Sequence, residues 1–132
     1  MTDHTIDTMA LAKYLEDTLP PRANKVFREA EAGRCRLYLP EIALAEFVYL
    51  SLKGRIRGTA ADTTVRETVH HLLSSDSISV SGMSPAAWDL FPSLPIREMH
   101  DRMIAADALA RRTPLVSNDP AFGAVESLRV IW

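Results

Sequence analysis

Short apolar stretches alternate with helical stretches along this chain, and no two-residue hairpin turn joins one apolar stretch to the next. This alternation implies βαβ crossovers, and hence strands that run parallel in one sheet. We therefore expect an α/β fold, a three-layer α/β/α sandwich with about five parallel strands. The expected strands are His4–Ile6, Arg36–Leu39, Ile78–Val80, Pro114–Ser117 and Leu128–Trp132.

Helices are predicted where apolar residues recur at helical spacing between the prolines and glycines that bound them. The predicted helices are Met9–Thr18, Arg22–Ala32, Glu41–Lys53, Ala61–Ser74, Pro85–Phe91 and Ile96–Arg112. Thr8 is expected to cap the first of them. In the third, the spacing predicts an inward apolar stripe formed by Ile42, Ala45, Val48, Tyr49 and Leu52.

The length and composition indicate an ordinary globular protein. With 132 residues the chain can bury a core, and we expect a single domain over residues 1–132. No run of about 18 apolar residues is present to span a membrane, and the polar N-terminus lacks the plan of a signal peptide. Cys35 is the only cysteine, which excludes an intramolecular disulfide and favours a cytoplasmic protein. The net charge of −2 neither favours nor excludes a nucleic-acid partner.

Four acidic residues are expected to meet at one edge of this sheet. Asp7 follows the first predicted strand and Asp119 follows the fourth, and the carboxyl ends of parallel strands share one edge. Glu46 and Asp101 lie about five residues into helices that start at that edge, or about 8 Å below it at 1.5 Å per residue. All four carboxylates can therefore point into one pocket.

Each of these acids also has a simpler interpretation. Asp7 and Asp119 are placed where aspartate commonly serves as a turn or N-cap residue. Glu46 is equally compatible with the solvent face of its helix, and Asp101 with an ion pair to a nearby arginine. Four converging carboxylates would repel one another unless a divalent cation bound them, and oxygen-only ligands suit Mg²⁺ or Mn²⁺. Such a carboxylate site serves in-line displacement at a phosphodiester.

Four segments carry a resemblance to a known family: TIDTMAL, LPEIALAEF, HDRMIAADALA and PLVSNDPAF. In order and spacing they resemble the PIN-domain nucleases over nearly the whole chain, especially the VapC-type toxins of toxin–antitoxin pairs. The resemblance implies that Asp7, Glu46 and Asp101 are the three core metal-binding acids, with Asp119 as a more peripheral fourth. It departs at Met9, where serine or asparagine is frequent in the family.

The same resemblance implies an activity and partners. Its members are Mg²⁺- or Mn²⁺-dependent endoribonucleases, hydrolases that cut RNA phosphodiester bonds by water attack. They are commonly homodimers, held inactive by an antitoxin protein that blocks the site. Thr8 and Ser117 resemble the hydroxyl residues that support the metal-binding acids and help to hold the ligating water.

Several other residues admit two interpretations. Lys53, Arg55 and Arg57 form a basic loop that could grip an RNA backbone or could simply be solvated. His100 is expected to pack or to face solvent, with a phosphate contact as the alternative. Asp107 is interpreted as structural or as the partner of an arginine one helical turn later.

Other functional classes stay open at this point. The chain could be a PIN-fold nuclease outside toxin–antitoxin systems, or a non-catalytic binding module that keeps the fold. A phosphotransfer enzyme with an aspartyl phosphate at Asp7 fits less well. Phosphatases of that type place a second aspartate where this chain has Met9, and receiver domains place a lysine after a late strand.

Overall fold

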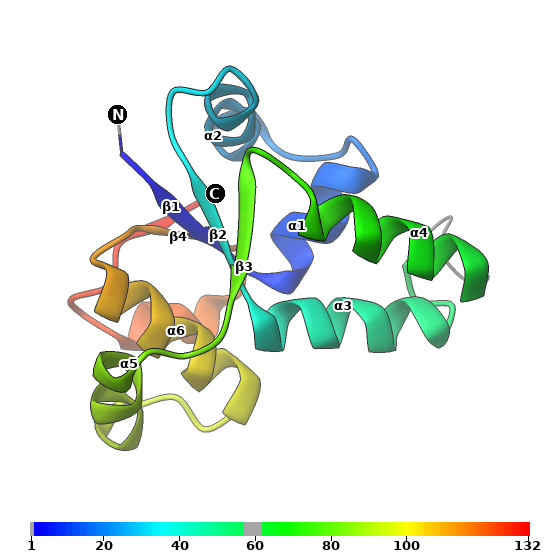
Figure 1. The fold of residues 1–132 in the computed structure, drawn as a ribbon. Helices are drawn as coiled ribbons and strands as arrows, with labels where there is room; N and C mark the ends of the chain where they lie inside the picture. Colours follow the sequence, from blue (N-terminus) through cyan, green and yellow to red (C-terminus); the bar gives the residue numbers. More distant parts are fainter. Residues whose placement is uncertain (1, 57–61) are drawn as a thin grey trace.

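The computed structural model describes residues 2–56 and 62–132, and its centre is a five-stranded sheet in which every pairing is parallel. The strand order is β3-β2-β1-β4-β5 (Figure 1), as crossovers from one strand to the next require. The predicted parallel α/β class is therefore confirmed. The strands are β1 (His4–Ile6), β2 (Leu37–Pro40), β3 (Ile78–Ser81), β4 (Leu115–Val116) and β5 (Val130–Ile131).

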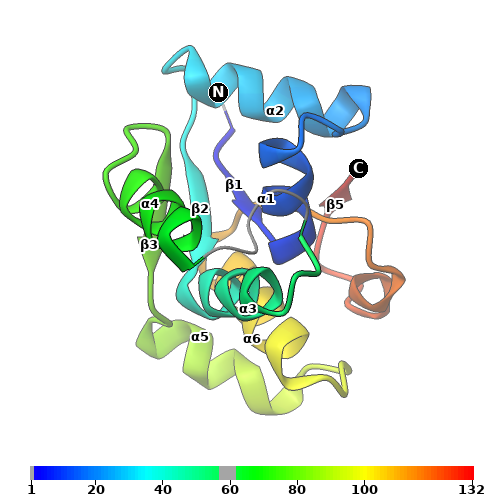
Figure 2. The ribbon, with the colours of Figure 1, turned by 90° about the vertical axis from the view of Figure 1, so that its right-hand side faces the viewer.

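Helices cover both faces of the sheet. In Figures 1 and 2, α1, α2 and α4 lie to one side and α5 with α6 to the other, while α3 extends from the carboxyl end of β2. The helices are α1 (Thr8–Leu15), α2 (Pro21–Glu31), α3 (Glu41–Leu52), α4 (Asp62–Leu73), α5 (Pro85–Leu90) and α6 (Met99–Arg111). Two short 3₁₀ turns, η1 (Phe91–Ser93) and η2 (Pro120–Ala124), follow α5 and β4.

The core lies between the sheet and these helices. The central strands β1 and β4 are buried at every residue, as expected where helices cover both faces of a parallel sheet. On α6 the buried positions are mostly small, including Ala105, Ala106 and Ala108. Small side chains let this helix pack close to the strands, so its backbone is held firmly against the sheet.

The predicted inward stripe of α3 is wrong for Ala45, Tyr49 and Leu52, which are exposed, whereas Ile42 and Val48 pack against the core. The residues that this helix buries are Ala43, Leu44, Phe47 and Ser51, whereas Tyr49 is 58% exposed. Leucine, alanine and valine occur on nearly every side of this helix, so the apolar period gives no clear direction. The error matters because Glu46 lies between the buried side and the exposed side of α3.

The predicted start of the long helix at Ile96 is also wrong. The helix α6 begins at Met99, because the Glu98 carboxylate caps it by accepting hydrogen bonds from the backbone N–H groups of His100 (3.0 Å) and Asp101 (2.7 Å). Ile96 is instead a core residue, 3% exposed, in the segment that leads into the helix. Asp101 therefore lies in the first turn of α6, nearer the sheet edge than the sequence predicted.

The first helix differs in a related way. Thr8 is the first residue of α1, and Asp7 is its N-cap. The other boundaries either coincide with the predicted ones, as both ends of β1 do, or differ from them by at most three residues, as is usual at helix and strand ends. Among the helices in the described part of the chain, none is both long enough and apolar enough to cross a membrane.

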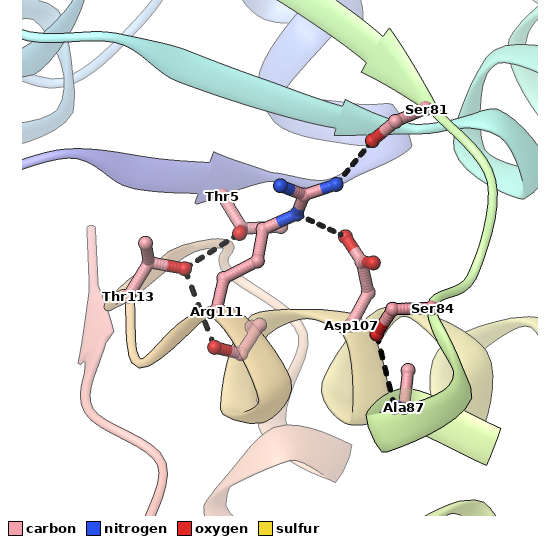
Figure 3. A network of polar contacts seen from close by, with 8 residues as sticks. Thr5, Ser81, Ser84, Ala87, Asp107, Arg111 and Thr113 are labelled. Carbon is pink, nitrogen blue, oxygen red and sulfur yellow. Dashed lines mark hydrogen bonds and ion pairs between the residues drawn. The ribbon is translucent and has the colours of Figure 1, made fainter.

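A buried ion pair fixes the last turn of α6 to the sheet. Asp107 is 1% exposed, and Arg111 donates from Nε to its Oδ2 at 3.2 Å, which confirms the interpretation of Asp107 as an ion-pair residue. Figure 3 shows the same guanidinium reaching Ser81 at the end of β3, and its Cζ lies 4.2 Å from the centroid of the Tyr38 ring. One side chain thus connects α6 to β2 and β3.

Removing this cation should destabilise the protein strongly. In Arg111→Met, the buried carboxylate of Asp107 loses its partner, so we expect the free energy of unfolding near neutral pH to fall by about 3 kcal/mol. Urea denaturation measures it. The double variant Asp107→Asn/Arg111→Met, which leaves no unpaired charge, should recover much of that loss. Equal losses in the two variants would contradict the role assigned to the ion pair.

Candidate active site

Two of the four predicted acids are held at the carboxyl edge of the sheet by capping hydrogen bonds. Asp7 follows β1, is 5% exposed, and accepts from the backbone N–H of Ala10 at 2.8 Å through Oδ1. Asp119 follows β4 and caps η2, with Oδ1 accepting from Ala121 N–H at 2.9 Å. The simpler interpretation of both as N-caps is thus confirmed. Because each cap uses Oδ1, the other carboxylate oxygen is left for the site.

Strand pairing and one serine bring these two aspartates together. β1 and β4 are neighbours, with Ile6 opposite Val116, so the residues that follow them leave the sheet side by side. Ser117 is 1% exposed; its Oγ accepts from Asp119 N–H at 3.0 Å. Its side chain also hydrogen-bonds to Asp7. Ser117 therefore contacts both acids, while its predicted support of a metal site stays a prediction.

Asp101 reaches the same edge from the first turn of α6. Burial raises the pKa of its carboxyl to about 7, and the negative charges of Asp119, Glu98 and Glu46 and a hydrogen bond shared with Asp119 act in the same direction. Burial also raises the pKa of Asp7, to about 6. Hydrogen bonds from Ser117 and Ala10 partly oppose this rise, and the charges of Asp119 and Glu46 add to it. The carboxyls of Asp7 and Asp101 therefore both respond to the charges of Asp119 and Glu46.

Glu46 approaches from the second turn of α3. Its side chain is 30% exposed, so the solvent-facing interpretation is partly correct. It lines a hollow of about 510 Å³ together with Ile42, Tyr49 and His100. Glu46 is thus both open to solvent and close enough to Asp7 and Asp101 to raise their pKa values.

His100 and Glu98 belong to this edge, and sequence reasoning missed both contacts. The Nδ1 atom of His100 lies 2.9 Å from Glu98 Oε1 and 3.5 Å from Glu46 Oε2. Burial acts to raise the pKa of Glu98, but the backbone N–H groups of Asp101 and His100 and the imidazole lower it overall. An acid just after a proline-bounded segment is a helix-start signal that could have identified Glu98.

The other predicted site residues that the structure describes form no hydrogen bond to the four acids through their side chains. The Thr8 hydroxyl donates to the Ala43 carbonyl at 3.2 Å, which ties α1 to α3, so its support of the metal-binding acids stays a prediction. Lys53 and Arg55 are exposed beyond the end of α3, with Lys53 Nζ 5.3 Å from the centroid of the Tyr49 ring. Arg57 lies outside the described residues.

The donor set fits a hydrated divalent ion better than a closed metal cage. Within residues 2–56 and 62–132, no three His, Cys, Asp or Glu side chains form a group that could hold a metal ion by themselves. Mg²⁺, however, commonly keeps several waters and uses only one or two carboxylates, together with substrate phosphates. Raised pKa values on two of the acids show that the site favours a proton or another positive charge. Carboxylate oxygens that favour a nearby positive charge are suitable ligands for Mg²⁺ or Mn²⁺.

Comparisons with known proteins were made for the chain and for its fold. A family model described as the PIN domain matches residues 5–128. No curated protein matches the chain.

Solved structures with the same fold include the following three, each from a bacterium. VapBC2 from Rickettsia felis, bound to a DNA fragment from its promoter, superposes with a TM-score of 0.75 at 18% identity, covering 98% of each chain. DNA-bound VapBC from Salmonella typhimurium gives 0.72 at 18% identity, covering 99% of this chain and 98% of that one. A toxin-antitoxin complex from Klebsiella pneumoniae gives 0.68 at 16%, covering 98% and 96%.

The raised pKa of Asp101 predicts how stability depends on pH. From the ordinary 3.8 to about 7, the unfolded chain releases this proton while the folded protein keeps it. Stability is therefore lost as pH rises through that window. Asp101→Asn removes the loss. Without metal, the variant should be more stable than the wild type at about pH 8, by on the order of 1 kcal/mol after solvent screening.

The same comparison near pH 4 is the control for this prediction. There the wild-type carboxyl is neutral in the folded protein and only partly ionised in the unfolded chain. Little of the stability loss has then occurred, so the two proteins should unfold at similar urea concentrations. Denaturation in EDTA at the two pH values measures the difference. A variant that is destabilised to the same extent at both would contradict the assigned electrostatics.

Proposed function

The chain belongs to the PIN domain family, and on this premise we propose that it is a metal-dependent endoribonuclease that hydrolyses RNA phosphodiester bonds. PIN domains are nucleases, so the family supports hydrolase activity in general. The observation that carries the proposal is the group of four acids at the carboxyl edge, where burial and mutual repulsion raise the pKa of Asp7 to about 6 and of Asp101 to about 7. Burying several carboxylates close together destabilises the folded protein unless a cation binds them.

In this proposal the chain's own residues have distinct tasks. Asp7, Glu46 and Asp101 would hold the Mg²⁺ or Mn²⁺ ion, and Asp119 would lie at its periphery. The bound ion would supply an activated water and offset the charge that develops on the phosphate. Ser117 orients Asp7 and Asp119 through its two hydrogen bonds, while the capping N–H groups hold one oxygen of each. The exposed side of Glu46 leaves room for the RNA strand.

We further propose that the protein is the toxin of a toxin–antitoxin pair. The support is the resemblance of its motifs to VapC-type toxins, together with a fold shared with chains from VapBC structures and from a toxin-antitoxin complex. In this setting an antitoxin protein would block the acidic edge, and the chain would act as a cytoplasmic homodimer. Each subunit would be one domain over residues 1–132.

Cleavage of RNA by purified protein tests the nuclease and its site together. Asp7→Asn, Glu46→Gln and Asp101→Asn should each lower the rate of Mg²⁺- or Mn²⁺-dependent cleavage by more than about 100-fold. Substituting even a residue that only hydrogen-bonds to a metal ligand typically lowers metal affinity or activity by about 10- to 100-fold. Residual activity can be followed by gel electrophoresis of a labelled transcript, with EDTA as a second control.

Asp89→Asn is the matched control, because it removes an exposed acid of α5 whose charge is not among those that raise the pKa values of Asp7 and Asp101. It should cleave at the wild-type rate. Cleavage by the Asp101→Asn variant at the wild-type rate would reject the assigned acids. Metal-independent cleavage would reject the metal, and cleavage of DNA but not RNA would reject the substrate class.

The basic residues after α3 give a separate prediction. If Lys53 and Arg55 grip the RNA backbone, binding should weaken steeply with salt, because each phosphate contact releases condensed counterions. In an Asp101→Asn background, Lys53→Gln/Arg55→Gln should reduce the slope of log affinity against log salt by about 1.4, or about 0.7 for each contact to a single strand. Fluorescence anisotropy of a labelled oligonucleotide measures this slope. An unchanged slope would mean that these two residues are solvated and do not contact RNA phosphates.

A further inference from the structure

A second hollow lies at the amino ends of the strands, opposite the acidic edge. Its volume is about 430 Å³, and its walls come from the end of α6, the entry to β4, the entry to β5 and the N-terminal segment. Arg112 and Arg129 both line this hollow, together with Thr2 and Ser127. The nuclease chemistry proposed above uses none of these residues.

The hollow carries positive charge with no acid to balance it. Of the described residues that line it, two are arginines and none is acidic. In the part of the chain that the structure describes, neither Arg112 nor Arg129 forms an ion pair or a side-chain hydrogen bond. By contrast, Arg28, Arg34 and Arg111 each pair with a carboxylate. Two unpaired guanidinium groups beside one hollow make it a place for an anion.

The backbone at Arg112 supports this interpretation independently. Arg112 ends α6 in the left-handed conformation, with φ 58°, where glycine would avoid the steric penalty that a Cβ brings. Capping does not need the side chain, because the backbone N–H groups of Arg112 and Thr113 donate to the Leu109 and Ala108 carbonyls, each at 3.0 Å. The strained position therefore holds a side chain that the helix end does not require.

The surroundings of Arg129 carry charges of both signs. Arg129 also lines an adjoining hollow of about 290 Å³ with Lys25, His4 and Glu29, and the Glu29 carboxylate is paired with Arg34. His4 is 9% exposed; burial, first, and the charge of Arg129 lower its pKa, so its imidazole stays neutral at neutral pH. Its Nδ1 atom is buried without a hydrogen-bond partner among the described residues. The charge of Arg129 thus acts on the pKa of His4 as a secondary effect, after burial.

We propose that the hollow between α6, β4 and β5 binds a phosphate group through Arg112 and Arg129. The planar guanidinium fork matches the oxygens of phosphate, and the hydroxyls of Thr2 and Ser127 can donate to the remaining ones. Thr113 takes no such part, because its hydroxyl is engaged with Thr5 at 2.7 Å and with the Ala108 carbonyl at 3.4 Å. The phosphate can belong to a free monoester or to a nucleic-acid backbone.

Titration with inorganic phosphate tests the site directly. In a ¹H–¹⁵N spectrum of the whole chain with EDTA, the amide signals of Thr2, Thr113 and Ser127 should shift saturably. Arg112→Gly and Arg129→Gln should each weaken binding by about tenfold, the size expected for a charged hydrogen bond. The glycine suits the φ of position 112, so that variant should stay folded while losing the side chain.

Arg22→Gln is the matched control, since it removes the same charge from an exposed position of α2. It should bind phosphate as the wild type does. Wild-type affinity in both Arg112→Gly and Arg129→Gln, or no saturable shift of these amides, would overturn the proposal. Neither result would bear on the acids of the opposite edge.

Two further ligands identify the source of the phosphate. A nucleoside monophosphate that binds with the same dependence on Arg112 would indicate a free phosphate monoester. An oligonucleotide without terminal phosphates, tested in an Asp101→Asn background, would indicate a backbone phosphate if Arg112→Gly weakens its binding. Either result supports the site, and failure of both ligands together with phosphate rejects it.

Discussion

The parallel pairing of β1 with β4 is the constraint on which the candidate site depends. It sets Ile6 opposite Val116, so the chain leaves both strands at the same edge, carrying Asp7 and Asp119. Ser117 then joins the two acids, and α6 brings Asp101 to Asp119. A shift of one residue in either strand would turn an acid into the core and a core residue toward the solvent. Register, more than any single contact, therefore positions the site.

The sequence was sufficient for the fold class and for the shared edge of the acids, because both follow from strand order and from residues that directly follow strands. It was not sufficient for α3, where apolar residues on most sides left the buried face undetermined and placed Tyr49 inward. It also placed the start of α6 too early. There a tertiary contact, the burial of Ile96, prevailed over local helix propensity. The contacts of His100 with Glu98 and Glu46 depend on that corrected start, so the sequence could not predict them.

Charge is distributed unequally along the strand direction. At the carboxyl edge, the negative charges of the acids raise the pKa of Asp101. At the amino edge, Arg112 and Arg129 line a hollow that has no acidic residue among its described lining residues. Between the two, the Asp107–Arg111 pair is buried and nearly balanced. The sheet thus separates a region that favours cations from one that favours anions, with α6 contributing to both.

The double role of two acids has an evolutionary consequence. Asp7 and Asp119 each cap the start of a helical segment. Homologues that lost the catalytic activity would therefore still be selected to keep aspartate, asparagine or serine at these positions, because capping stabilises the fold. Asp101 and Glu46 carry no such obligation, since Glu98 already caps α6 and Glu46 lies mid-helix. Among descendants of this chain, drift at positions 46 and 101 would therefore be the earliest visible mark of a lost activity, while positions 7 and 119 would stay polar long afterwards.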